Sequence, residues 1–181
     1  MKILNKTKCY LAGAIQLENK SISQNWRNEF EQKTKEIGIV CLNPLKKMFK
    51  NFENESFDYQ DKLLELLKIG DYAQVHHKCK SIIRKDYAAI DRADFLVVVL
   101  NPKIPTWGTN CEIFLAQQLR KPVFLVIDGG YKNIPLWWAG LFKPKWVYDN
   151  IDDVVLTLKK IDSNKIKLNK KYWRILEDTL M

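Results

Sequence analysis

Two short and almost entirely apolar segments, residues 95–100 (FLVVVL) and 122–127 (PVFLVI), place the strongest constraint on the fold of this chain. Runs of this length that are rich in β-branched residues are typical of strands covered on both faces, as in a parallel sheet. Two parallel strands need a crossover connection, and residues from about 109 to 119 between them have the composition of a helix. A βαβ unit is therefore expected at the centre of the molecule.

The rest of the chain repeats this alternation. Residues 8–12 predict a strand that ends at Gly13, residues 23–38 a helix, and residues 39–44 a second strand. Residues 46–60 have the composition of a loop, and those from 61 to 93 are helical but broken near Gly70. A short helix or turn (135–142), an edge strand (145–149) and a helix (150–161) follow.

Alternating strands and helices predict an α/β fold, with a three-layer, mostly parallel, doubly wound sheet of about five strands, Rossmann- or flavodoxin-like. We expect one domain over residues 1–162 and an appended basic helix over 163–181. The formal charge of +9 favours anionic partners. Four well-separated cysteines, the absence of a signal-peptide layout and the lack of an apolar run of about twenty residues predict a cytoplasmic protein with no membrane segment.

Ligands of open parallel sheets bind at the carboxyl ends of the strands, where three loops are expected here: residues 13–16, 101–110 and 128–133. Glu112 is predicted in the first turn of the helix that follows the second loop. The helix dipole would keep a first-turn carboxylate ionised, which suits a nucleophile better than a general acid. The alternative is that Glu112 only completes a capping box with Thr109, because T-x-x-E is the spacing of that motif.

Three segments in order resemble one protein family. Residues 10–13 (YLAG), 85–100 (KDYAAIDRADFLVVVL) and 105–123 (PTWGTNCEIFLAQQLRKPV) resemble the nucleoside 2-deoxyribosyltransferases and their sister group, the 2'-deoxynucleoside 5'-monophosphate N-glycosidases. The resemblance spans most of residues 8–126. It implies an enzyme that acts on the bond between a base and a deoxyribose.

The resemblance also assigns catalytic roles. Glu112 matches the nucleophile that attacks the anomeric carbon, Asp86 the acid that helps to protonate the leaving base, and Tyr10 the hydroxyl that orients the nucleophile. Two structural alternatives remain open at this point. Asp86 could be the N-cap of a short helix, and Tyr10 could be a core aromatic residue. Arg27, beside Trp26, is expected to be a surface charge.

The substrate-binding residues implied by the resemblance are Gly13, Thr106, Trp107, Gly108, Thr109 and Asn133. The two glycines would let the backbone approach the ligand. Thr106 replaces an Asp that binds the sugar 5'-hydroxyl in the transferases of free nucleosides, and a hydroxyl at a helix N-terminus is better suited to a phosphate. Asn133 is a candidate for a residue lent to a neighbouring subunit, since the resemblance implies a homo-oligomer with residues 134–142 at an interface.

The expected function is cleavage or exchange of the N-glycosidic bond of a 2'-deoxynucleotide, preferably a deoxynucleoside 5'-monophosphate, through a covalent glycosyl-glutamate. Deoxyribosyl transfer between free nucleosides and nucleotide binding without catalysis are the alternatives. No metal or organic cofactor is implied. Nucleic acid is not expected as a partner, because the basic tail is more typical of a solvated helix face or an oligomer contact.

Overall fold

A parallel five-stranded sheet forms the centre of the computed structural model, which describes residues 3–16, 18–46, 48 and 56–166. The strand order is β2-β1-β3-β4-β5, and every neighbouring pair is parallel. The predicted fold class is confirmed. The strands are β1 Lys8–Gly13, β2 Val40–Leu42, β3 Phe95–Val99, β4 Val123–Val126 and β5 Val147–Tyr148.

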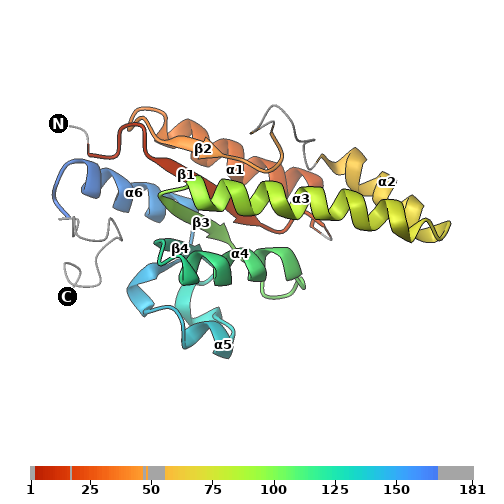
Figure 1. Ribbon diagram of the computed structural model, residues 1–181. Coiled ribbons are helices and arrows are strands. Elements are labelled where there is room, and N and C mark those ends of the chain that lie inside the picture. The colour runs from red at the N-terminus through yellow and green to blue at the C-terminus, as the bar shows by residue number, and fades with distance from the viewer. Residues whose placement is uncertain (1–2, 17, 47, 49–55, 167–181) are drawn as a thin grey trace.

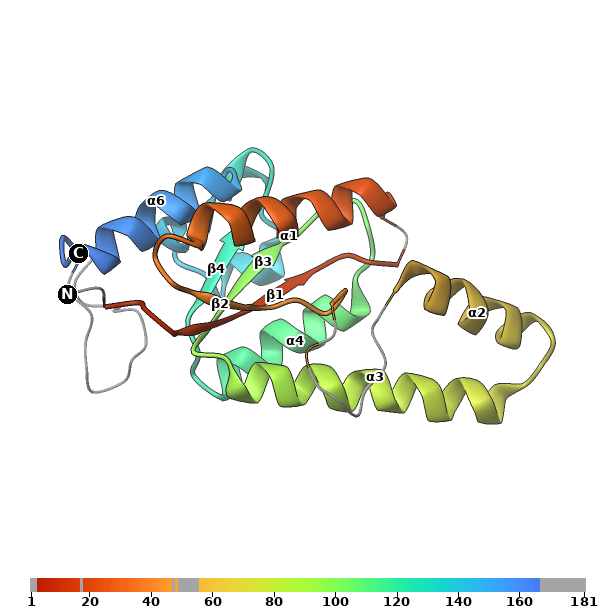
Figure 2. The same ribbon diagram turned by 90° about the horizontal axis from the view of Figure 1, so that it is seen from above.

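Helices cover both faces of the sheet (Figures 1 and 2). One layer contains α1 and α6, and the opposite layer contains α3 and α4. The helices are α1 Lys20–Thr34, α2 Phe57–Lys68, α3 Tyr72–Arg92, α4 Trp107–Gln118, α5 Leu136–Ala139 and α6 Ile151–Asp162, with 3-10 turns η1 Gly130–Asn133 and η2 Pro144–Trp146.

The alternation of side chains along the strands builds two separate cores. In β1, Cys9 and Leu11 belong to the core under α1 and α6, whereas Tyr10 and Ala12 belong to the core under α3 and α4. All four side chains are almost completely buried. Tyr10 therefore points into the same layer that holds residues 85–90 of α3 and residues 106–116 of α4.

Helices α2 and α3 form a hairpin that extends beyond the sheet (Figures 1 and 2). The predicted break near Gly70 is confirmed: Gly70 has φ 81° between the two helices, a conformation that favours glycine. Leu63 is the only residue of α2 whose side chain is buried. The other apolar side chains of α2 are half-buried or exposed, and it is the C-terminal half of α3 that packs on the sheet.

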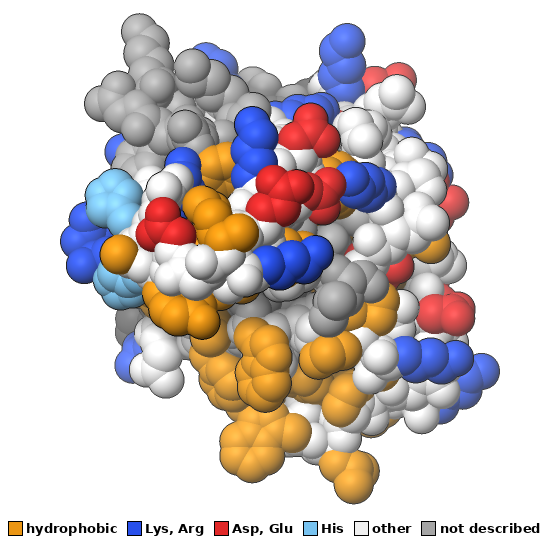
Figure 3. All heavy atoms as spheres, turned by 90° about the vertical axis from the view of Figure 1, so that its right-hand side faces the viewer, with side chains coloured by type: hydrophobic (Ala, Val, Ile, Leu, Met, Phe, Trp, Pro, Cys, Tyr) orange, Lys and Arg blue, Asp and Glu red, His pale blue; other side chains and the backbone are white. Residues whose placement is uncertain are grey.

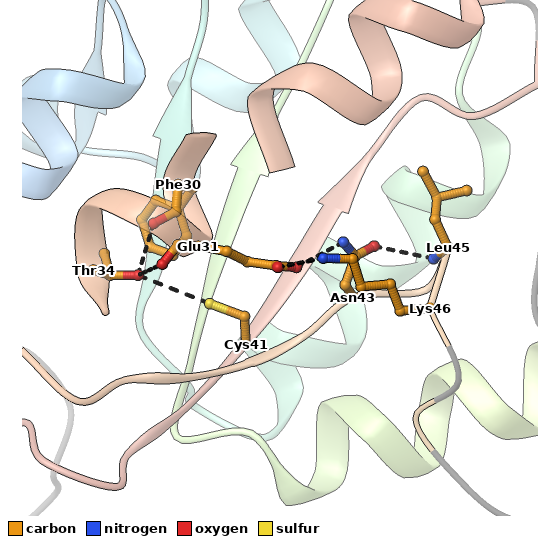
Figure 4. Close-up of polar contacts among 7 residues, drawn as sticks. All are labelled: Phe30, Glu31, Thr34, Cys41, Asn43, Leu45 and Lys46. Carbon is orange, nitrogen blue, oxygen red and sulfur yellow. Dashed lines mark hydrogen bonds and ion pairs between the residues drawn. The ribbon is translucent and has the colours of Figure 1, made fainter. Parts of the chain in front are cut away.

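The loop after β2 is fastened to α1 by a group of polar contacts (Figure 4). The Asn43 side chain donates a hydrogen bond to Glu31 Oε1 at 2.8 Å and accepts one from the Leu45 backbone N–H at 3.0 Å. Lys46 forms an ion pair with the other oxygen of Glu31. These contacts fix the backbone at Pro44, whose carbonyl oxygen lies 3.5 Å from Nζ of the buried Lys85.

Candidate active site

The Tyr10 hydroxyl and the Glu112 carboxylate are in direct contact although they lie 102 positions apart in the sequence. The hydroxyl donates a hydrogen bond to Glu112 Oε1 at 2.6 Å. Tyr10 is fully buried on β1, and Glu112 on α4 is half-buried. A short hydrogen bond from a buried hydroxyl fixes the direction of the carboxylate. Tyr10 is thus a core aromatic residue that also orients an acid.

Asp86 adds a second acid to this pair. It is buried on α3, and its carboxyl group is also a hydrogen-bonding neighbour of Tyr10. Burial raises the pKa of Asp86 to about 6, while the positive charge of Lys85 and the neighbouring Tyr10 hydroxyl oppose this rise. An acid in this range can hold or release a proton near neutral pH. The structure therefore gathers Tyr10, Asp86 and Glu112 at one place.

The N-cap interpretation of Asp86 is wrong. Helix α3 begins at Tyr72 with Asp71 as its N-cap, so Asp86 lies well inside a long helix and cannot cap its start. Helical structure is predicted over residues 61–93 with a break near Gly70, and the N-cap interpretation placed a second helix start at Asp86. The helix runs through that position without interruption.

The capping-box interpretation of Glu112 is also wrong, and so is its predicted place in a first turn. Helix α4 starts at Trp107 with Thr106 as its N-cap, which makes Glu112 the sixth residue of the helix. Glu112 lies in the second turn, where the influence of the helix dipole is small. The helix begins earlier than predicted because Gly108 is accommodated within its first turn. The orientation of Glu112 depends on Tyr10 instead.

The predicted binding residues of α4 surround the start of that helix. Thr106 and Thr109 are buried, whereas Trp107 is 81% exposed. A Cβ on Gly108 would meet no atom within 4 Å, so this glycine borders open space. No side chain of the described residues caps the first turn of α4, which leaves backbone N–H groups there available to an acceptor.

Gly13 and Asn133 lie on the other two loops of the carboxyl edge. A Cβ on Gly13 would approach the Val99 carbonyl oxygen to 2.9 Å and the Trp26 ring to 3.0 Å, so this glycine permits close packing of β1 on β3 and α1. Asn133 is exposed at the end of η1, and its side chain donates a hydrogen bond to the Asp128 carbonyl at 2.7 Å.

Two buried cations near the site were missed by the sequence reasoning. Arg27 is fully buried rather than on the surface, and it donates hydrogen bonds to the carbonyls of Gly13 at 2.9 Å and Ser23 at 2.6 Å while lying 4.4 Å from the Trp26 ring. Lys85, beside Asp86, is 1% exposed. Their burial becomes visible only in the folded structure, because a basic residue within a helix is ordinarily exposed to solvent.

The described part of the chain has no group of three or more His, Cys, Asp or Glu side chains that could hold a metal ion. Within the same residues, no helix is long and apolar enough to cross a membrane. The acids at this site are connected through a tyrosine hydroxyl.

A parallel sheet with the strand order β2-β1-β3-β4-β5 is the flavodoxin-like form of the doubly wound α/β fold, whose ligands bind at the carboxyl ends of the strands. The family profile of the nucleoside 2-deoxyribosyltransferases matches residues 9–133. The chain belongs to the nucleoside 2-deoxyribosyltransferase family, and it is an enzyme of glycosyl transfer or cleavage whose small-molecule partner is a nucleoside. A search of curated protein sequences finds no match.

Similar solved structures include proteins from three bacteria. A conserved protein from Enterococcus faecalis V583 has a TM-score of 0.54 at 17% identity and covers 86% of this chain and 98% of its own. A 2-deoxyribosyltransferase from Bacillus psychrosaccharolyticus has a TM-score of 0.52 at 19% identity, with 84% and 96% covered. The CMP N-glycosidase BcmB from Clostridium botulinum has a TM-score of 0.46 at 15% identity, with 84% and 98% covered.

Proposed function

We propose that this enzyme cleaves or exchanges the N-glycosidic bond of a 2'-deoxynucleotide through an ester formed on Glu112. The observation that supports the proposal most directly is the 2.6 Å hydrogen bond from the buried Tyr10 hydroxyl to Glu112. It holds one carboxylate in a fixed direction within a family that acts on deoxyribosyl groups. A nucleophile needs this kind of orientation more than a surface carboxylate does.

The proposed reaction has two steps. In the first, a Glu112 oxygen forms a bond to the anomeric carbon of the sugar while the bond from that carbon to the base nitrogen breaks, and its electron pair leaves with the base. In the second, a water molecule or another base attacks the same carbon and releases Glu112. The developing positive charge on the sugar is stabilised by the adjacent carboxylate.

Asp86 is proposed to supply the proton that the leaving base requires. It adjoins Tyr10 from the α3 side, and the burial that raises its pKa to about 6 lets part of the population carry a proton near neutral pH. In the second step, the water or incoming base returns a proton to Asp86. The acid and the nucleophile thus remain distinct groups linked by one hydroxyl.

We infer a preference for a 5'-monophosphate from the start of α4. Thr106 presents a neutral hydroxyl residue at the N-cap, and the first turn of the helix has no capping side chain among the described residues. A phosphate would gain hydrogen bonds from these backbone N–H groups and from the helix dipole. The net charge of +9 also favours an anionic substrate.

Chromatography of reaction mixtures tests the proposal. The protein is incubated with deoxynucleosides and with their 5'-monophosphates, each with and without a second base, and the released or exchanged base is measured. Glu112→Gln should show no turnover, and intact-mass spectrometry of the quenched wild type should detect one added deoxyribosyl group. Full activity of Glu112→Gln would refute the role of Glu112.

Two alternatives give different results in the same experiment. Transfer among free nucleosides, without a preference for monophosphates, would indicate a deoxyribosyltransferase and would argue against Thr106 as a phosphate-binding residue. Binding of a nucleotide that remains unchanged would indicate a catalytically silent binding protein. The presence of two oriented acids favours catalysis, since a protein that only binds a sugar does not need them.

We also propose that the enzyme is a homo-oligomer. Figure 3 shows the face of the molecule that lies on the right-hand side of Figure 1. Large apolar side chains gather on the lower part of this face. Leu136 is 92% exposed and Trp137 is 72% exposed on α5, and Trp107 on α4 is similarly exposed. Exposed apolar groups of this size are typical of protein interfaces. Asn133, just before α5, remains the candidate for contact with a neighbouring subunit.

A further inference from the structure

Lys85 is a buried cation immediately next to one of the two acids of the site. The side chains of Lys85 and Asp86 are 2% and 11% exposed, and Lys85 Nζ lies 3.6 Å from Asp86 Oδ1. Neighbouring residues on a helix normally point in different directions, so the long lysine side chain must turn toward Asp86 to make this contact. Burying a lysine in this way is costly unless its charge is compensated.

The second contact of Lys85 comes from the loop after β2. Its Nζ lies 3.5 Å from the Pro44 carbonyl oxygen, at the limit of a hydrogen bond. That carbonyl is held in place because Asn43 is fastened to Glu31 on α1 and accepts a hydrogen bond from Leu45 (Figure 4). Lys85 therefore lies between a fixed carbonyl and a carboxylate.

Asp86 has a different neighbour on each element around it. Lys85 approaches it on α3, Tyr10 approaches it from β1, and Glu112 on α4 is connected to it through Tyr10. Asp86 Oδ1 is buried and has no hydrogen-bond partner among the described residues, so the charge of Lys85 is what compensates this oxygen. Loss of that charge would leave the oxygen buried without compensation.

We propose that Lys85 is a positioning residue for Asp86, holding the Oδ1 side of the carboxyl group through an ion pair inside the buried site. The inference rests on the proposed function only in assigning acid–base work to Asp86. The ion pair sets how readily Asp86 takes up a proton, and it leaves the rest of the group to interact with Tyr10.

The balance of effects on Asp86 gives the direction of the expected change. Burial raises its pKa to about 6, and the charge of Lys85 is the largest of the effects that lower it. Without Lys85, burial would be opposed mainly by Tyr10, and the pKa of Asp86 would rise further. An opposite charge at this distance typically changes a carboxyl pKa by about one to three units.

The experiment compares Lys85→Met with the wild type, with Lys85→Arg, and with Arg84→Met. Methionine keeps the unbranched stem without the charge, arginine keeps the charge, and Arg84 is an exposed cation of the same helix. Carbon-13 NMR of the Asp86 carboxyl group follows its titration directly. We expect Lys85→Met to raise the midpoint by about one pH unit or more, which is a tenfold or greater increase in proton affinity. Lys85→Arg should restore most of the difference, and Arg84→Met should match the wild type.

Turnover supplies a second readout. If Asp86 donates its proton to the leaving base, kcat/KM falls as pH rises through its pKa, and the falling limb should move to higher pH in Lys85→Met by the same amount as the NMR midpoint. A merely structural role of Lys85 would lower kcat/KM at every pH without moving the limb.

An unchanged Asp86 midpoint in Lys85→Met would overturn the proposal. If that variant does not fold, nitrogen-15 NMR of the Lys85 ammonium in the wild type decides the matter. Its resonance should respond to pH across the Asp86 titration, with that response lost in Asp86→Asn, and no response in the wild type would equally overturn the proposal. Because the NMR titrations need no turnover, a wild type that cleaves no nucleoside would refute the proposed function while the role of Lys85 is still decided.

Discussion

The hydroxyl of Tyr10 lies between the two acids, and its removal tests that connection. Tyr10→Phe keeps the ring in the core and deletes the 2.6 Å hydrogen bond to Glu112. Hydrogen bonds to charged groups contribute about 1.5–3 kcal/mol, so we expect kcat to fall by about tenfold to hundredfold. Steady-state kinetics with the best deoxynucleotide substrate measures the effect.

Tyr131→Phe is the matched control for this prediction. The Tyr131 hydroxyl donates a hydrogen bond to the Ala139 carbonyl at 3.3 Å, so its acceptor is a backbone group and not an acid. Its loss should leave kcat within about twofold of the wild type, since a neutral hydrogen bond of this length contributes little. Equal losses in both variants would mean that the Tyr10 hydroxyl has no special part in the reaction.

The raised pKa of Asp86 predicts a pH-dependent difference in stability between the wild type and Asp86→Asn. An acid whose folded-state pKa lies above its unfolded value stabilises the fold fully below the unfolded pKa, 3.8 here, and loses this contribution as pH rises through about 6. Each pH unit between these two pKa values corresponds to about 1.4 kcal/mol, so the total loss of stabilisation is about 3 kcal/mol.

Urea unfolding of both proteins at a series of pH values measures this difference. The free energy of unfolding of the wild type minus that of Asp86→Asn should decrease from pH 4 to pH 7 by about 3 kcal/mol and then become constant. Contributions of the other titrating groups largely cancel in the subtraction. A difference that stays flat over this range would show that burial does not perturb Asp86 in solution.

Single residues differ in how far their surroundings could be predicted. Tyr10, Asp86 and Glu112 were selected because three short segments match a family pattern, and their contact in space then appears in the structure. The sequence predicted an ionised Glu112 from the dipole of a first helical turn. This prediction was wrong because the helix starts earlier. The burial of Lys85 could not be predicted from the sequence, because its Nζ contacts the Pro44 carbonyl in the loop after β2, 41 positions away.

At the level of elements, Arg27 of α1 links that helix to the end of β1. Its guanidinium donates to the Gly13 and Leu11 carbonyls of β1 and to the Ser23 carbonyl of α1, all within the protein interior. We expect Arg27→Met to lower the free energy of unfolding by about 2–4 kcal/mol, because several buried carbonyls lose their donor at once. Urea unfolding at pH 7 measures the loss.

Arg27→Lys and Arg84→Met distinguish geometry from charge in this prediction. Lysine keeps the charge of Arg27 but cannot present a planar fork to three carbonyls, so Arg27→Lys should recover less than half of the lost stability. Arg84→Met removes an exposed charge and should stay within about 0.5 kcal/mol of the wild type. Complete recovery by lysine would indicate that charge alone matters at this position.

The elements themselves were predicted best where the pattern is continuous. The apolar runs at 95–100 and 122–127 correspond to β3 and β4, because a strand buried on both faces needs apolar residues at every position. Helix α4 was placed two residues late because Trp107 is exposed and Gly108 is a weak helix former. The helical stretch predicted over residues 61–93, with its break near Gly70, corresponds to most of α2 and to α3.

For the whole molecule, the sequence predicted the parallel doubly wound sheet, but it could not indicate how the α2–α3 hairpin projects from it. Alternation of strands and helices determines the layers, whereas the direction of a helical hairpin depends on contacts that are distant in sequence. The appended helix predicted for residues 163–181 falls mostly on residues 167–181, outside the described residues. It stays a prediction, together with the boundary after residue 162.

The exposed apolar side chains of α5 give the prediction for the assembled molecule. If Leu136 and Trp137 lie at a subunit interface, then the wild type should sediment as a dimer or larger assembly, and the double variant Leu136→Glu/Trp137→Glu as a monomer. Two buried carboxylates at an interface without partners each cost several kcal/mol, which is enough to dissociate a typical assembly at micromolar concentration. Sedimentation velocity over a concentration series measures the change.

Leu156→Glu is the control, because Leu156 is 51% exposed on α6, in the helix layer opposite α4. This variant introduces the same type of charge at an exposed leucine and should keep the assembly of the wild type. A monomeric wild type, or an assembly that survives the double substitution on α5, would contradict the proposed interface. If the neighbouring subunit also completes the site, then the α5 double variant should lose turnover in parallel with dissociation, whereas Leu156→Glu should retain both.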